Sequence, residues 1–349
     1  MNAIVPPQAA RNDAPRDAQS AHAGTGHQGG SGRRAGVLAV HSVEQVLFTV
    51  PEIAAAEAFY TAFGLDVRHP GDRLDRIDLH TFGHPHRWMT VVENGQAKTL
   101  QYISFGIFAE DESAFRDRIA ALGAACEPHP LAPAGGLWLR TPDGLPVRLV
   151  VAGKVSPAQK TVASPRLSPA RADASAPMRS QACKVYPRWL SHVLLFTPDV
   201  ARMIQFCETV LGLRLSDRSG NLVAFLHTPH GSDHHLFAFV KSAAPGLHHT
   251  SWDVGSLDDV GEGSEQMRNA GYPDGWGVGR HVLGSNYFYY ARDPWGSFAE
   301  YSFDIDFVPA DRDWVAGDYP PEDSFYLWGP SVPDWFVINT EQPAPAPAA

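Results

Sequence analysis

Three residues in the second half of the sequence have the types needed to hold a divalent metal. His192, His249 and Glu300 lie 57 and 51 residues apart, each within an apolar segment that has the pattern of a strand. Two imidazoles and one carboxylate on one face leave open positions on an octahedral ion, as in non-haem Fe(II) oxygenases. Zinc enzymes use the same ligand set, so these residues alone predict a metal site without choosing the metal.

The two halves of the chain resemble each other, and this internal repeat predicts the architecture. VLFTVPEIAAAEAFYTAFGLDV (46–67) and VLLFTPDVARMIQFCETVLGLRL (193–215) each indicate an apolar strand, a helix that starts at Pro-Glu or Pro-Asp, and Gly-Leu leading into another strand. RTPDGLPVRLV (140–150) and RDPWGSFAEYS (292–302) each indicate a turn before a final strand. The repeat predicts an α+β fold of tandem βαβββ modules, two per domain, forming two barrel-like domains.

Comparison of the two halves also limits the number of metal sites. Alignment of the repeats places each candidate ligand opposite a residue of another type, with Glu44 opposite His192, Tyr102 opposite His249 and Arg148 opposite Glu300. An arginine at the third position would repel a cation. We therefore expect one metal site per chain, in the C-terminal half.

Composition divides the chain into five segments. Residues 1–36 contain few large apolar side chains, and we expect a disordered tail there. The stretch SPAQKTVASPRLSPARADASAPMRS is typical of a linker, so residues 154–184 are expected to join two domains. The predicted segments are a tail (1–36), a metal-free domain (37–153), the linker (154–184), a metal-binding domain (185–308) and an extension rich in aromatic residues and proline that ends in a loose tail (309–349).

Charge and cysteine content exclude several classes of protein. A formal net charge of −10 argues against nucleic acid as the main partner. No apolar run reaches the roughly 18 residues of a membrane span, and the N-terminus lacks the order of a secretion signal, so we expect a cytoplasmic protein. Three cysteines without any CxxC spacing indicate neither a disulfide framework nor a thiolate metal site.

The segments around the candidate ligands resemble a known family. LSHVLLFTPD, DHHLFAFV, GLHHTSWDV and GRHVLGSNYFYYARDPWGSFAEY are similar to the catalytic domain of type I extradiol catechol dioxygenases, within the vicinal oxygen chelate superfamily. The likeness covers residues 185–308, and residues 37–152 resemble the metal-free N-terminal domain of that family. It implies that His192, His249 and Glu300 bind Fe(II), with Mn(II) as the alternative ion, and that both atoms of O2 are inserted into a catechol-type ring in aromatic-compound catabolism.

The resemblance also implies roles for three further residues. His235, fourteen residues before the second ligand, matches the acid–base histidine of the family. Tyr290 and His281, ten and nineteen residues before the last ligand, match groups that contact the substrate oxygens. A neutral histidine beside the substrate can take and return a proton, and a tyrosine and a histidine can hold an ionised catechol by hydrogen bonds.

Several neighbouring residues have simpler interpretations. Strand alternation predicts that His248 points away from the face that carries His249, which indicates a structural role. The same alternation lets one residue of the pair His234 and His235 face the site, and the spacing favours His235. Asn286 is expected to fix its loop. Five histidines of the first half are expected to be surface or structural residues, namely His41, His69, His80, His84 and His86.

The substrate and the reaction are less closely defined. Leu194 stands where some relatives have a polar residue that helps to hold a substrate carboxylate, and we expect Phe237, Trp252, Trp276 and Phe288 to favour an apolar ring substituent. Alternatives are a hydroquinone-cleaving dioxygenase, a glyoxalase- or isomerase-like metalloenzyme, and a non-enzymatic module of the bleomycin-resistance type. Relatives are oligomeric, so a homo-oligomer is expected. The segment 307–339 could cover the open side of the metal-binding domain, contact another subunit or cap the core.

Overall fold

The computed structural model describes residues 32–165 and 176–341. Most of the expected N-terminal tail (1–31), the middle of the expected linker (166–175) and the end of the chain (342–349) lie outside the described residues. Within the described ranges, no helix has both the length and the apolar character needed to cross a membrane.

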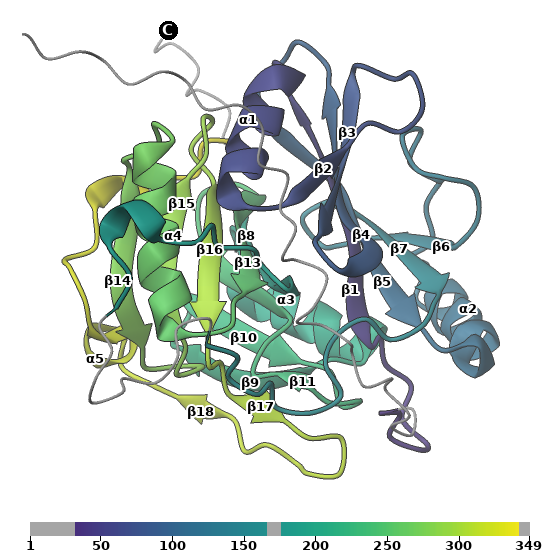
Figure 1. Cartoon of the computed structure of the whole chain (residues 1–349). Helices are drawn as coiled ribbons and strands as arrows, with labels where there is room; N and C mark the ends of the chain where they lie inside the picture. The colour runs from purple at the N-terminus through teal and green to yellow at the C-terminus, as the bar shows by residue number, and fades with distance from the viewer. Residues whose placement is uncertain (1–31, 166–175, 342–349) are drawn as a thin grey trace, which may run out of the picture. The chain divides into compact units, whose positions relative to one another are not determined.

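The first half of the described chain forms a seven-stranded sheet (Figure 1). Its elements are β1 (Ser42–Val50), α1 (Ile53–Phe63), β2 (Asp66–Arg68), β3 (Arg76–Thr81), β4 (His84–Glu93), β5 (Thr99–Ile107), α2 (Glu112–Ala121), β6 (Leu137–Arg140) and β7 (Pro146–Val151). The strand order is β2-β3-β4-β1-β5-β7-β6. At its centre β1 and β5 run antiparallel, and each also pairs with a parallel strand, β4 and β7 respectively.

The second half forms a ten-stranded sheet in the described part of the chain. Its main elements are β8 (Trp189–Thr197), α3 (Val200–Phe206), β9 (Arg214–Ser219), β10 (Val223–His227), β12 (Phe237–Lys241), β13 (Gly246–Asp253), α4 (Leu257–Asn269), β14 (Gly275–His281), β15 (Tyr287–Arg292) and β16 (Phe298–Phe303). The strand order is β18-β9-β10-β12-β8-β13-β16-β15-β14-β19, where β18 is Gly317–Asp318 and β19 is Tyr326–Trp328. Here β8 and β13 form the antiparallel centre, with β12 and β16 as their parallel partners.

The elements after β17 (Phe307–Val308) belong to the segment that we call the C-terminal extension, residues 309–341. It contains β18 (Gly317–Asp318), α5 (Pro321–Ser324) and β19 (Tyr326–Trp328). β18 pairs with β9 and β19 pairs with β14, at the two edges of the sheet. A separate two-stranded pair joins β11 (Ser232–Asp233) to β17 (Phe307–Val308). The α+β class, with two β-sheets of matching pairing scheme, is confirmed.

In each half of the chain, one glycine ends the first helix, as the repeated Gly-Leu predicts. Gly64 after α1 has φ 95°, and Gly212 after α3 and its short π-helical turn has φ 74°, in the left-handed region that favours glycine. A Cβ on Gly64 would lie 2.1 Å from Val185 O, and one on Gly212 would lie 2.2 Å from Leu38 O. Each helix end therefore approaches backbone from the opposite half of the chain.

Helix α4 lies across β14, β15 and β16 and fixes the strand that carries Glu300 (Figure 1). Ser256 caps its start by accepting a hydrogen bond from Asp259 N at 3.1 Å. Beneath the helix, the ring of Tyr301 stacks on Phe63 with centroids 4.0 Å apart, and its hydroxyl donates to Phe63 O at 2.8 Å. Tyr301 thus anchors β16 on the side opposite to that of its neighbour Glu300.

The glycines of α4 provide a test of this packing. A Cβ on Gly263 would lie 2.7 Å from the ring of Tyr301, whereas one on Gly261 would meet nothing within 4 Å. We expect Gly263→Ala to lower the free energy of unfolding by about 1–2 kcal/mol, because overpacking exceeds the gain in helix propensity. Gly261→Ala should raise it by about 0.5–1 kcal/mol. Urea unfolding of the metal-free chain measures both, and stabilisation by both substitutions would contradict this account.

Candidate metal centre

The three candidate ligands lie on three adjacent strands. Ser251 of β13 is in register with His192 of β8 on one side and with Glu300 of β16 on the other. His249 lies two residues before Ser251 and therefore on the same face of β13. Tyr290 of β15 continues the row, because it pairs with Glu300. Strand register thus brings together side chains that are far apart in the sequence.

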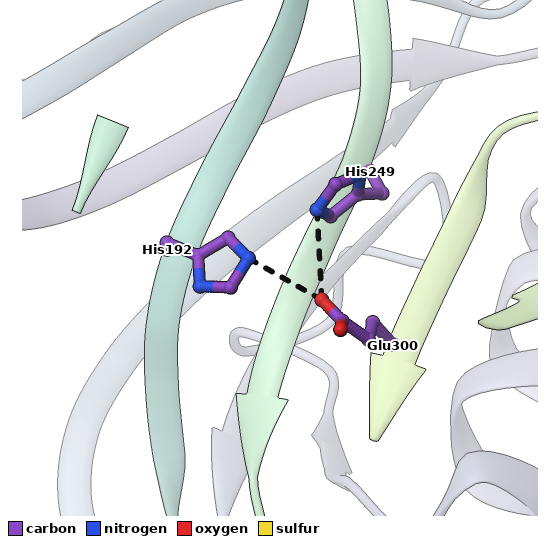
Figure 2. Close-up of side chains that lie close together, drawn as sticks. All are labelled: His192, His249 and Glu300. Atoms are coloured by element: carbon purple, nitrogen blue, oxygen red, sulfur yellow. Dashed lines mark ion pairs between the residues drawn. The ribbon is translucent and has the colours of Figure 1, made fainter. Parts of the chain in front are cut away.

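The ligand atoms of the three side chains point toward one another (Figure 2). His192 Nε2 lies 3.3 Å and His249 Nε2 lies 3.6 Å from Glu300 Oε2, and the three ligand atoms are within 4.8 Å of one another. His249 Nε2 and Glu300 Oε2 are buried without a hydrogen-bond partner among the described residues. Buried polar atoms are costly when unpaired, so their convergence fits a cation between them.

The electrostatics of the site favour the protonation forms that a metal requires. Burial lowers the pKa of His249 well below its ordinary value, and the neighbouring His248 and His192 lower it further. Burial alone would raise the pKa of Glu300, but the close approach and the charge of His192 bring it below its ordinary value. A neutral imidazole and an ionised carboxylate are the forms that ligate.

Each ligand also has a contact on the side away from the other two. Asn286 Nδ2 donates to Glu300 Oε1 at 3.0 Å and to Ser302 Oγ at 3.0 Å. Ser191 Oγ lies 3.3 Å from His192 Nδ1. The sequence interpretation of Asn286 as a loop-fixing residue missed its contact with Glu300. No spacing signals this contact, because only the pairing of β15 with β16 brings the amide to the carboxylate.

His248 does not point away from His249, so that prediction was wrong. The register of β13 against β8 shifts between Leu247 and His249, which places a β-bulge at His248. The bulge breaks the two-residue alternation, and the two imidazoles lie side by side with their Nδ1 atoms 2.7 Å apart. His248 Nε2 lies 3.0 Å from Phe336 O.

The structure places the three residues with implied catalytic roles around the same cavity. His235 lies between β11 and β12, with its ring centroid 4.1 Å from that of His192. His281 ends β14, and its Nε2 lies 2.9 Å from Tyr290 OH while its Nδ1 lies 2.8 Å from Phe325 O. Burial lowers the pKa of His235 well below its ordinary value and raises that of Tyr290 well above it.

The cavity has a volume of about 360 Å³ and walls that are largely apolar. Its apolar side chains include Leu194, Leu222, Val223, Phe225, Val240, Leu283, Phe325, Phe336 and Val337. The C-terminal extension supplies three of these, and it therefore covers one side of the cavity. The expectation for four aromatic residues was wrong, because none of them borders the cavity and all are buried in the core, namely Phe237, Trp252, Trp276 and Phe288.

The matching positions of the first sheet are used differently. Ser104 pairs with Arg148 as Ser251 pairs with Glu300, so the repeat alignment holds in the register of the strands. Arg148 donates to Gly135 O at 3.0 Å and to Ala134 O at 3.1 Å. Within residues 32–165 and 176–341, the triad in the second half is the one group of His, Cys, Asp or Glu side chains with metal-binding geometry.

Comparisons with known proteins identify relatives of this chain. Residues 189–301 match the model of the Glyoxalase/Bleomycin resistance protein/Dioxygenase superfamily. Metapyrocatechase 2 of Cupriavidus necator is 48% identical over 304 residues, which cover 87% of this chain and 93% of that protein.

Two solved structures share the fold. The Mn(II)-bound glyoxalase from Novosphingobium aromaticivorans is 25% identical with a TM-score of 0.64, over 84% of this chain and 93% of that chain. Homoprotocatechuate 2,3-dioxygenase from Arthrobacter globiformis is 18% identical with a TM-score of 0.68, over 87% of this chain and 92% of that chain. The second likeness concerns the fold alone.

The amide of Asn286 provides a test of how Glu300 is held. Asn286→Ala should weaken metal binding about 10- to 100-fold, since contacts behind a ligand orient it. Ser302→Ala is the matched control, because it removes the other acceptor of the same amide and leaves Glu300 supported. Chelator competition measures the affinity, and thermal unfolding of the metal-free variants checks their folding. Equal losses of affinity in the two variants would contradict a specific role for Asn286.

Proposed function

Because this chain belongs to the extradiol ring-cleaving dioxygenases of the glyoxalase/bleomycin resistance/dioxygenase superfamily, we propose that it opens catechol-type rings with O2 at an Fe(II) ion. The metal would be held by His192, His249 and Glu300. The observation that carries this assignment is the convergence of three buried ligand atoms, two of them without a hydrogen-bond partner among the described residues. Identity of 48% to a metapyrocatechase over most of both chains supports the catechol-type substrate.

Fe(II) is the proposed ion, and Mn(II) is the alternative. Two imidazole nitrogens and one carboxylate oxygen, with room for further ligands on the cavity side, suit both ions. A Mn(II)-bound glyoxalase of the same fold supports keeping the second ion in view. When bound, the ion supplies a positive charge that lowers the pKa of a catechol hydroxyl and open positions for the two reactants.

His235 is the proposed acid–base residue. Its ring is buried beside His192 on the cavity wall, and burial keeps it neutral at physiological pH because its pKa lies well below the ordinary value. A neutral imidazole can take the proton of a substrate hydroxyl and return it later in the reaction. Among the described residues that border the cavity, His235 has the ring nearest to that of His192, with a centroid distance of 4.1 Å against 5.4 Å for His249.

Tyr290 and His281 are proposed to orient the substrate oxygens. The raised pKa of Tyr290 keeps its hydroxyl protonated, so that it can donate a hydrogen bond. That hydroxyl lies 2.9 Å from His281 Nε2, which couples the two side chains. An ionised catechol oxygen near Glu300 would meet this pair from the side opposite to His192, because Tyr290 and His192 lie on either side of Glu300 in the row.

The apolar wall favours a substrate with an apolar ring substituent. Leu194, Phe225 and Phe336 contribute to the wall, and burial of a carboxylate against such groups is costly. The lining includes one lysine among the described residues, Lys241. Its Nζ donates a hydrogen bond to Pro198 O at 3.3 Å in an exposed position.

The finer organisation of the chain stays a prediction. We propose that each sheet consists of two βαβββ modules that close into a barrel, and that residues 37–153 and 185–308 are the two domains joined by 154–184. The matching pairing schemes of the two sheets support this proposal. Assembly into a homo-oligomer and a cytoplasmic location likewise stay predictions.

Ring cleavage is tested with the full-length chain loaded anaerobically with Fe(II). We expect about one iron per chain, O2 uptake with catechols and a yellow ring-opened product. His192→Ala and Glu300→Ala should lose both the iron and the activity, because each removes a ligand atom. Glu44→Ala is the matched control, since it removes a half-buried carboxylate at the repeat position in the first half, and it should keep both.

Three outcomes would contradict the proposal. Bound zinc or nickel with no O2 uptake for any catechol or hydroquinone would favour a glyoxalase- or isomerase-like reaction. Uptake of O2 with hydroquinones alone would favour the hydroquinone-cleaving alternative. Retention of activity in Glu300→Ala would show that the metal site is elsewhere.

The apolar wall leads to an expected substrate preference. We expect kcat/KM for an alkyl-substituted catechol to exceed that for a catechol with a carboxylate substituent by at least about tenfold. The comparison uses initial rates of O2 uptake at saturating O2, with unsubstituted catechol as the reference. A carboxylated catechol that is turned over more efficiently than every neutral one would contradict the inferred preference.

A further inference from the structure

The residue that precedes each of three site histidines contacts the ring of that histidine from behind. Ser191 Oγ lies 3.3 Å from His192 Nδ1. In the two consecutive His-His pairs, the Nδ1 atoms of His234 and His235 are 3.0 Å apart, and those of His248 and His249 are 2.7 Å apart. In each case the contact reaches Nδ1, so the Nε2 atom of the second residue is left for other partners.

Each preceding residue is held in turn by a group that accepts hydrogen bonds. Ser191 Oγ donates to Asp233 Oδ2 at 2.6 Å. His234 Nε2 lies 2.8 Å from Asp217 Oδ2, and His248 Nε2 lies 3.0 Å from Phe336 O. Among the described residues, three short hydrogen-bond relays thus lie behind site histidines, and each relay ends on an oxygen atom.

The acceptor at the end of a relay determines where the ring protons sit. A carbonyl oxygen can only accept, so His248 carries its proton on Nε2 and its Nδ1 is an acceptor. His249 must then carry its own proton on Nδ1 to complete the contact. Its Nε2 keeps a free lone pair, and this is the atom that lies 3.6 Å from Glu300 Oε2.

The same reasoning applies to the other pair. The oxygen atom Asp217 Oδ2 accepts from His234 Nε2, so in a neutral His234 ring Nδ1 accepts from His235 Nδ1. His235 is left with an unprotonated Nε2, which is the form that a general base needs. Asp217 is fixed from its other oxygen, since Oδ1 accepts from Gly317 N at 2.7 Å.

We propose that His248 and His234 are positioning residues that hold the ring proton of the next histidine on Nδ1. His249 is thereby turned so that Nε2 faces the metal, and His235 is turned so that Nε2 can accept a proton. The inference rests on the proposed function for the roles of His249 and His235. The inference concerns which ring nitrogen carries the proton in a neutral histidine, not whether the histidine is protonated.

The C-terminal extension gains a defined task from this inference. Phe336 O ends the relay behind His249, and Gly317 N fixes the carboxylate behind His235. A third backbone group, Phe325 O, lies 2.8 Å from His281 Nδ1, which turns His281 Nε2 toward Tyr290 OH. The extension therefore supplies three backbone groups, each of which orients a different imidazole of the site.

Paired substitutions of His248 test the first relay. His248→Asn keeps an acceptor oxygen near the position of Nδ1, whereas His248→Gln places its amide near the position of Nε2 and leaves His249 Nδ1 without a partner. We expect His248→Gln to weaken the apparent Kd for Fe(II) about 10- to 100-fold in anaerobic chelator competition, and His248→Asn to stay near the wild-type value. Equal affinities in the two variants would overturn the inference.

The same pair of substitutions at His234 should act on turnover. His234→Gln should lower kcat while KM and the Fe(II) affinity stay unchanged, and His234→Asn should restore kcat, because Asn again offers an acceptor to His235 Nδ1. Loss of Fe(II) affinity together with kcat, or equal kcat in the two variants, would overturn the role of His234. Thermal unfolding of each metal-free variant checks that the chain is folded.

A spectroscopic measurement on the unsubstituted chain decides the case if a variant fails to fold. Long-range ¹H–¹⁵N correlation of the histidine rings, in full-length chain labelled at histidine and loaded with diamagnetic Zn(II), reports which nitrogen carries each proton. We expect Nε2–H in His248 and His234 and Nδ1–H in His249 and His235. A proton on His235 Nε2 or His248 Nδ1 would overturn the inference. Neither this spectrum nor metal affinity depends on ring cleavage, so both separate this inference from the proposed reaction.

Discussion

The site depends on the burial of one ionised carboxylate among imidazoles. An isolated buried charge costs several kcal/mol, and Glu300 is fully buried. Asn286 offsets part of this cost at Oε1, while His192 and His249 approach Oε2. Removal of any one of these groups leaves the charge less well compensated. A cation bound between the three ligand atoms would compensate the remaining negative charge. The geometry of the ligands and the burial of Glu300 therefore both depend on the metal.

The sheet positions Glu300 and its neighbours through the register of its strands and through packing on the opposite face. The row from β8 through β13 and β16 to β15 places two ligands and Tyr290 at the same level. Tyr301, the neighbour of Glu300, is locked beneath α4 and against Phe63. The first sheet has the same pairing scheme but carries Arg148 where the second carries Glu300, so a shared scaffold hosts a metal site in one half alone among the described residues.

Much of this arrangement could be predicted from the sequence because the chain contains an internal repeat. Alternating apolar strands and the aligned halves identified His192, His249 and Glu300, and the structure brings those three together. The β-bulge at His248 was not predictable, because a register shift leaves the hydrophobic pattern intact. The contacts of Asn286 and of the C-terminal extension depend on long-range packing, which local patterns do not encode. The aromatic residues that border the cavity were predicted wrongly for the same reason. Phe336, for example, is distant in sequence from the strands that carry the ligands.

The central claim is that one metal binds between the ligand atoms of His192, His249 and Glu300, and that none binds at the matching positions of the first sheet. Anomalous diffraction at the iron absorption edge, from crystals grown anaerobically with Fe(II), tests it most directly. The account predicts one strong peak per chain within bonding distance of His192 Nε2, His249 Nε2 and Glu300 Oε2. A peak bonded through Nδ1 of either histidine, or a peak near Glu44 and Tyr102 in the first sheet, would contradict it.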